Sequence, residues 1–110
     1  MLLSKLSIPF DIVVDGANLI LVDIVPYYEY QDGKRTDNLQ GYKFVVVEDK
    51  SYEKFAVKIP SIVPAITKEQ MVASKEKIRV SFKNAIAKPY KTYSGEYELS
   101  VTATGINIEK

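Results

Sequence analysis

Residues 42–78 read YKFVVVEDKSYEKFAVKIPSIVPAITKEQMVASKEKI, and this stretch decides the fold. Its first part, residues 42–48 and 53–59, alternates side chains with a period of two. Phe44 falls on the apolar face of the first run, and Lys43 falls on the opposite face. This alternation predicts two β-strands, each with one buried face and one face in water.

Pro60 and Pro64 follow the second run, and proline cannot donate a hydrogen bond to a strand ladder. Thr67 and Gln70 then stand at the spacing of a capping box, in which each side chain bonds the backbone of the other residue. This spacing predicts a short helix over residues 68–74. The sheet is therefore expected to be interrupted once, by a helix.

The flanking sequence supplies the remaining strands. Residues 19–30 predict one long strand that bends at Pro26, while residues 77–87 and 97–108 predict a closing hairpin. Three strands, a helix and a hairpin are the order of an OB-fold. We therefore predict an all-β fold with one short helix: a small five- to six-stranded OB-fold-like barrel, with the helix between strands 3 and 4. Residues 1–18 would add an extra edge strand or a tail, and an open sandwich of the same strands is the alternative.

Composition limits the chemistry. One domain spanning residues 1–110 is expected, because this length is enough for a single hydrophobic core. The chain has no cysteine and no histidine, which removes thiol nucleophiles, the commonest metal ligand and the commonest general base. Its five scattered glycines form no phosphate-binding loop. We expect a protein that is not an enzyme and that needs no cofactor and no metal.

Localisation is predicted from the apolar runs. The opening MLLSKLSIPF is too short and too polar for a signal peptide, and no later run has membrane-spanning length. The absence of cysteine fits a reducing compartment. We expect a cytoplasmic protein with no membrane partner.

Charge is distributed unevenly along the chain, although its net value is only +1. Residues 34–95 hold 13 basic and 6 acidic side chains, a balance of +7, while both ends are acidic. Residues 77–95 include five cations and no acid. This imbalance fits a surface that binds a polyanion, and it fits a solvated strand face equally well.

The predicted binding residues come from the OB-fold pattern. In that fold, oligonucleotides bind the outer face of strands 2 and 3 and the loops joining strands 1–2 and 4–5, which here are residues 31–41 and 88–95. Single-stranded nucleic acid requires cations along its phosphates and flat rings under its bases. Tyr27, Tyr28 and Tyr30 are interpreted instead as a plug for the barrel end or as a protein-contact patch. The predicted nucleic-acid-binding residues are Lys34, Arg35, Lys43, Lys54, Lys58, Arg79, Lys83, Lys88, Tyr90, Lys91 and Tyr93.

VKIPSIVP at residues 57–64, followed after a helix-length gap by IRVSFKNAIAKPY at residues 78–90, resembles HelP-like proteins. These are small helicase-processivity accessory proteins of Gram-positive integrative and conjugative elements. The resemblance covers the last half of the chain; the first half matches in outline, and the basic C-terminal tail of some members is missing. It implies sequence-independent DNA binding and help for a helicase that unwinds transferred DNA, and it transfers no residue roles.

Together these patterns predict a DNA-binding accessory protein of a mobile genetic element or phage. It would bind single-stranded DNA or a fork in support of conjugation or DNA replication, with a helicase or another replication protein as its protein partner. The alternative is a protein–protein interaction or structural module of a phage or conjugation assembly. An oligosaccharide-binding barrel ranks last, because the chain has no tryptophan.

Overall fold

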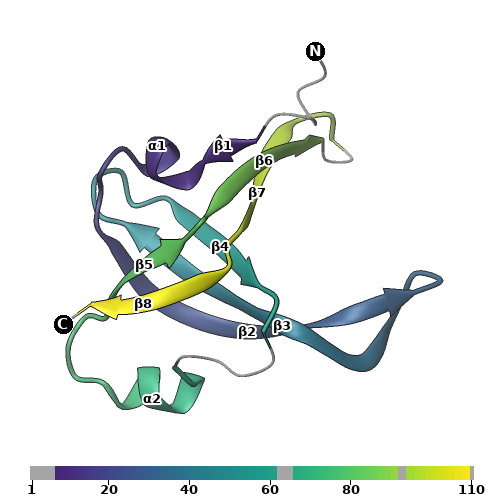
Figure 1. Ribbon diagram of the computed structural model, residues 1–110, viewed down its shortest axis with the longest axis horizontal. Helices are drawn as coiled ribbons and strands as arrows, with labels where there is room; N and C mark the ends of the chain where they lie inside the picture. Colours follow the sequence, from purple (N-terminus) through teal and green to yellow (C-terminus); the bar gives the residue numbers. More distant parts are fainter. Residues whose placement is uncertain (1–6, 62–65, 92–93, 110) are drawn as a thin grey trace.

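The computed structural model describes residues 7–61, 66–91 and 94–109, whose strands form one curved sheet (Figure 1). In chain order the elements are β1 (Ile8–Pro9), α1 (Phe10–Val14), β2 (Leu19–Gln31), β3 (Lys34–Glu48), β4 (Lys54–Ile59), α2 (Lys68–Ala73), β5 (Arg79–Lys83), β6 (Ile86–Lys91), β7 (Tyr97–Thr102) and β8 (Gly105–Glu109). The strands lie in the order β1-β6-β7-β4-β3-β2-β5-β8. β4 and β7 pair in parallel, and all other neighbours pair antiparallel. No helix within these ranges is long and apolar enough to span a membrane.

The strand arrangement corrects the predicted architecture. The fold is all-β with short helices, but the predicted five- to six-stranded barrel is wrong, because eight strands form an open sheet with β1 and β8 at its ends. The strand expected at residues 77–87 is broken at Asn84, whose φ of 52° lies in the left-handed region. The strand expected at residues 97–108 breaks between Thr102 and Gly105. These bends divide the expected hairpin into the pairs β5–β8 and β6–β7.

The N-terminal residues contribute an edge strand and an unpredicted helix. β1 pairs with β6 at one end of the sheet. At the start of α1, Phe10 is 2% exposed, and its ring meets the rings of Phe55 and Phe82 edge-on, with centroids 5.1 and 6.4 Å apart. Edge-to-face contacts of this kind stabilise a core beyond simple burial, so α1 covers part of the sheet.

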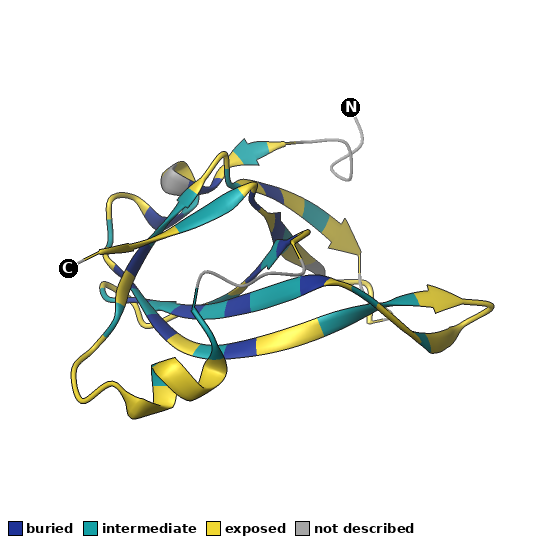
Figure 2. Ribbon diagram, turned by 60° about the horizontal axis from the view of Figure 1, so that its bottom comes forward, coloured by how far each residue is buried: buried dark blue, intermediate teal, exposed yellow. Residues whose placement is uncertain are grey.

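The inner face of the sheet carries the core, as the period-two alternation predicted (Figure 2). One cross-strand row is buried in every strand that it crosses. From β2 to β6 its members are Ile24, Phe44, Val57, Val101 and Ala87. Direct cross-strand partners share a face of the sheet, and successive residues alternate between faces. The rows on either side of this one therefore point to solvent.

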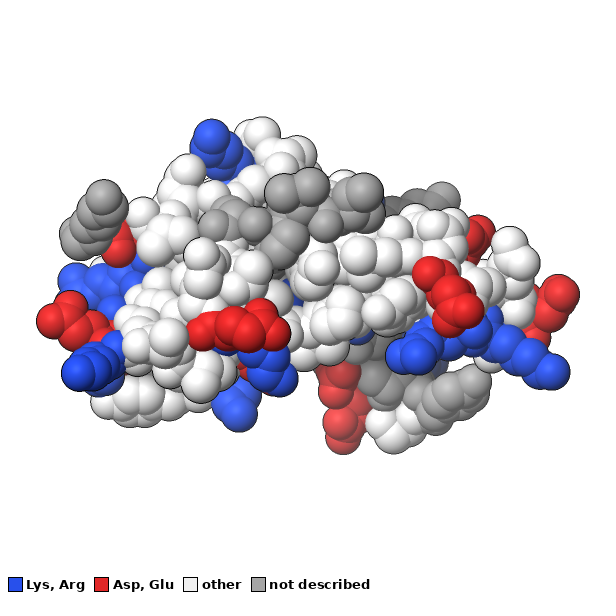
Figure 3. Space-filling view, turned by 90° about the horizontal axis from the view of Figure 1, so that it is seen from below, with Lys and Arg blue, Asp and Glu red and all other residues white. Residues whose placement is uncertain are grey.

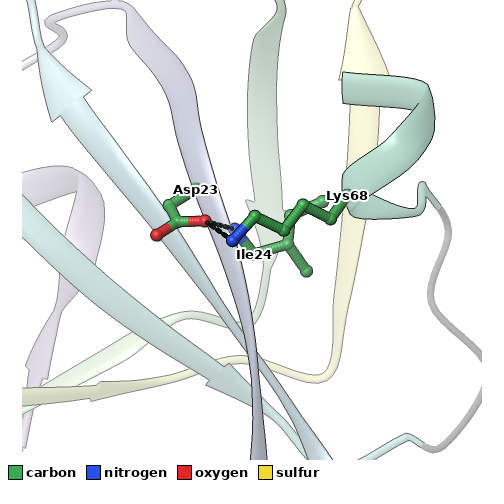
Figure 4. Close-up of polar contacts among 3 residues, drawn as sticks. All are labelled: Asp23, Ile24 and Lys68. Carbon is green, nitrogen blue, oxygen red and sulfur yellow. Dashed lines mark hydrogen bonds and ion pairs between the residues drawn. The ribbon is translucent and has the colours of Figure 1, made fainter. Parts of the chain in front are cut away.

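Helix α2 begins as predicted. The Thr67 hydroxyl accepts a hydrogen bond from the Gln70 amide at 3.1 Å, and the Gln70 side chain accepts one from the Thr67 amide at 2.9 Å. Lys68 lies 3.4 Å from the carboxylate of Asp23, which also accepts from the amide of Ile24 (Figure 4). The Lys68–Asp23 ion pair joins α2 to β2.

A buried carboxylate closes the connection between β3 and β4. The Glu48 side chain accepts hydrogen bonds from the amides of Lys50, Ser51 and Glu53, at 2.9, 2.7 and 3.1 Å. The Ser51 hydroxyl also donates to it. That hydroxyl and these amides stabilise the charged form, and they lower the pKa of Glu48 from 4.5 to about 2.

Acid should weaken the fold through Glu48. Between about pH 4.5 and about pH 2 the unfolded chain binds this proton while the folded chain does not, so the free energy of unfolding falls as pH falls. We expect the wild type to lose more stability between about pH 6 and about pH 3 than the Glu48→Gln variant, which has no carboxylate to titrate there. Urea denaturation of both proteins measures the two losses, and equal losses would contradict the prediction.

Candidate nucleic-acid interface

The residues next to the buried row on each strand are also cross-strand partners, and their side chains point to the outer face of the sheet. One outer row runs from β2 through β3, β4 and β7 to β6, and each of its members is exposed or half-buried. Its members are Val25, Lys43, Lys58, Thr102 and Ile86. Lys43 and Lys58 occupy the centre of this row, on the face where the sequence alternation placed them.

Two lysines are neighbours on this face, and no carboxylate of the described residues pairs with either of them. Lys43 and Lys58 are direct cross-strand partners, and like charges in that position destabilise a sheet. In the described part of the chain neither has a carboxylate within ion-pair distance, whereas Lys68 pairs with Asp23. The pair therefore concentrates positive charge that no described side chain neutralises.

Tyr27 lies beside the lysine pair, in a position that the sequence did not predict. The Lys58 ammonium nitrogen is 5.6 Å from the centroid of the Tyr27 ring, although β3 runs between their strands. The β3 partner of Tyr27 is Gly41, and backbone atoms of Ile59 and Pro60 lie close to the position that a β-carbon of Gly41 would occupy. Burial raises the pKa of Tyr27, because desolvation disfavours the charged phenolate. We call Tyr27, Lys43 and Lys58 the lysine face.

Three other predicted cations lie away from the lysine face. Lys54 and Arg79 occupy the two ends of a second outer row, which crosses β4, β3, β2 and β5. That row meets β3 four residues beyond Lys43, a distance of about 13 Å along the strand. Lys83 lies further on, at the end of β5. β5 lies on the side of β2 that is away from β3 and β4. Arg79 and Lys83 therefore lie on a part of the outer surface that is separate from the lysine face.

The predicted second loop is largely a strand, which corrects the expectation of a loop starting at residue 88. β6 pairs with β7 as far as Lys91. Lys88 and Tyr90 are exposed, and the Tyr90 hydroxyl donates to the Glu98 carboxylate at 2.9 Å, a bond that raises the pKa of Tyr90. The Tyr90 side chain is 43% exposed. Tyr93 lies outside the described residues.

The predicted first loop is a two-stranded arm, which corrects the expectation of a polar loop at residues 31–41. Asp32 and Gly33 have φ values of 52° and 78°, as in the two-residue hairpin turns that favour Asp-Gly. We call residues 27–41 the β2–β3 arm. It projects beyond the rest of the sheet (Figure 1), because β4 pairs with β3 only from Tyr42 onward. The turn brings Lys34 and Arg35 to the tip of the arm.

Arg35 stacks on a second tyrosine that the sequence did not single out for binding. Its guanidinium carbon is 4.7 Å from the centroid of the Tyr28 ring, a cation–π geometry. The direct cross-strand partner of Arg35 is Tyr30. Tyr28 is therefore a diagonal neighbour of Arg35 on the adjacent strand. Among the described residues no carboxylate pairs with this guanidinium. Its N–H donors remain available for an anion.

Charges on the lower face of the molecule are mixed. Figure 3 shows basic and acidic side chains together at the arm end and at the α2 end, with an uncharged stretch between them. On this face the cations form no continuous band. The predicted site is thus divided between the lysine face, the arm tip, and the outer surfaces of β5 and β6.

Comparisons with protein-family models, with curated proteins and with solved structures give no match for this chain. Function is therefore inferred from the chemistry of these surfaces. The lysine face brings two cations and one aromatic ring together on three adjacent strands.

Proposed function

We propose that this protein is a sequence-independent DNA-binding accessory protein, which binds single-stranded DNA or a fork through the lysine face. The observation that carries the proposal is the pairing of Lys43 with Lys58, with no carboxylate of the described residues within ion-pair distance of either. A phosphate chain placed over these two ammonium groups would remove their repulsion. Release of counterions from the DNA would then supply much of the affinity, without reading the base sequence.

The strand connections support an OB-like role for this face. β2, β3 and β4 form a meander, α2 follows, and β4 then pairs in parallel with β7. We infer that the open sheet is a divided version of the OB arrangement, in which β5–β6 and β7–β8 replace the fourth and fifth strands. OB-folds bind oligonucleotides on the corresponding outer face of their second and third strands.

The accessory role rests on the resemblance of residues 57–64 and 78–90 to HelP-like proteins. On that basis we propose a helicase or another replication protein as the protein partner. The setting would be the cytoplasmic DNA metabolism of a mobile genetic element or phage. The partner would act on DNA strands that this protein keeps apart.

Fluorescence anisotropy with labelled oligonucleotides tests the proposed binding. Two unrelated single-stranded sequences of equal length should bind the full chain with equal affinity, because phosphate contacts carry no sequence information. A duplex of the same length should bind more weakly. Failure to bind either single strand at low salt would contradict the proposal, as would a difference of more than about tenfold between the two sequences.

A second candidate function is a protein–protein module of a phage or conjugation assembly. The interspersed charges in Figure 3 favour it, and so does the exposed Tyr30 on the arm, because tyrosine is enriched at protein interfaces. A module of this kind would bind no oligonucleotide in the titration above. The same measurement therefore separates the two functions.

A further inference from the structure

The β2–β3 arm carries two tyrosines, Tyr28 and Tyr30, that are not part of the lysine face. Tyr27 lies at its base, Tyr28 is the next residue, and Tyr30 lies close to the turn. Successive side chains of a strand alternate between its faces, so Tyr28 and Tyr30 share one face of the arm and Tyr27 lies on the other. Two residues of a strand span about 7 Å, which is the length of about two stacked bases. Tyr30 is 67% exposed, so its ring contributes little to the core.

The arm has a defined shape although no third strand supports it. The Thr36 hydroxyl donates to the carbonyl oxygen of Glu29 at 2.9 Å, and the Asn38 side-chain amide donates to the Glu29 carboxylate at 2.7 Å. Residues 36–38 bulge opposite Glu29, since the register shifts between Tyr28 and Tyr30. A bulged edge is a poor template for an added strand. The arm would therefore bind through its side chains rather than its backbone.

Charge along the arm does not favour phosphate. Its acidic residues are Glu29, Asp32 and Asp37 and its basic residues are Lys34 and Arg35, a balance of −1. A phosphate chain is therefore attracted to the lysine face more strongly than to the arm. Stacking on aromatic rings needs no net charge, and each base offers a flat face to a ring.

We propose that the arm is a base-stacking element of the DNA site. Tyr30, and Tyr28 with Arg35 on one face of its ring, would stack on bases of a DNA strand that continues from the lysine face around the edge of the arm. This rests on the proposed DNA binding and gives it a substrate preference, because only unpaired bases can be splayed out to expose their faces. The arm thus selects single strands over duplex.

Two variants and a matched control test the arm, with a single-stranded oligonucleotide that contains 2-aminopurine and with a duplex as probes. We expect Tyr30→Ala to lower the affinity for the single strand by about tenfold, to leave the affinity for the duplex unchanged, and to reduce the fluorescence change of 2-aminopurine. Tyr30→Phe keeps the ring and should bind as the wild type. Tyr52→Ala is the control, because Tyr52 is 75% exposed in the turn at the opposite end of β3.

The outcomes distinguish this proposal from the proposed function. If the wild type binds neither probe, DNA binding itself is wrong. If the wild type binds the single strand and Tyr30→Ala binds it equally well, with the same 2-aminopurine response, the stacking role is overturned while DNA binding stands. Loss of single-strand affinity in both Tyr30→Ala and Tyr30→Phe would also overturn it, because the phenylalanine ring still stacks.

Discussion

Replacing both Lys43 and Lys58 with glutamine should lower the affinity for a single-stranded oligonucleotide by at least about tenfold. A bond to a charged group contributes roughly 1.5–3 kcal/mol, and every 1.4 kcal/mol is a factor of ten in affinity. The fold should survive, because both side chains lie on the outer face and their mutual repulsion disappears. Anisotropy titrations of the wild type and the double variant measure the change.

A second double variant controls for net charge. Lys75 and Lys77 are exposed between α2 and β5, and changing both to glutamine removes the same total charge from another surface. Its affinity should stay within about threefold of the wild type, because exposed charges more than about 10 Å away are largely screened at 0.1 M salt. Equal losses in the two double variants would show that overall charge, rather than the lysine face, attracts the DNA.

The Gly41→Ala substitution should destabilise the protein by about 3 kcal/mol, the upper part of the usual range for overpacking. A β-carbon at residue 41 would lie 2.2 Å from the carbonyl oxygen of Ile59 and 3.0 Å from the α-carbon of Pro60. Both are backbone atoms, so β3 and the end of β4 must separate to admit it. Urea denaturation measures the loss, which is a large fraction of a typical domain's stability.

Gly105→Ala is the matched control for this substitution. The nearest atom to a β-carbon at residue 105 is the δ-carbon of Lys83, at 3.5 Å, on a flexible side chain. Its effect on stability should stay within about 1 kcal/mol. If Gly41→Ala is as mild as Gly105→Ala, the close approach of β3 to the end of β4 is not a constraint on the fold.

Sequence patterns correctly predicted the features that depend only on residues close together in the sequence. The alternation around Phe44 predicted which face is buried, because successive side chains of a strand point to opposite faces of the sheet. The spacing of Thr67 and Gln70 predicted the start of α2, because a capping box involves only neighbouring residues. The break at Asn84 has no comparable pattern, since asparagine adopts the left-handed region without a glycine or proline to announce it.

The site was predicted less well, because its contacts join different strands. The alternation placed Lys43 and Lys58 on the outer face, but only the register makes them direct partners. Tyr27 reaches Lys58 across β3, and a pattern within one strand carries no information about that contact. Asp32-Gly33 was itself a hairpin motif, and the polar residues that follow it led to the prediction of a loop.

The salt dependence of binding by the wild-type chain tests the central claim most directly. With two lysines on phosphates of a single strand, the logarithm of the affinity should fall with the logarithm of salt concentration at a slope of about −1.4 or steeper. The measurement is an anisotropy titration at several salt concentrations between about 50 and 200 mM. A steep slope that the Lys43→Gln/Lys58→Gln variant loses is the result predicted for a phosphate-binding lysine face. An affinity that stays flat across this range would contradict it.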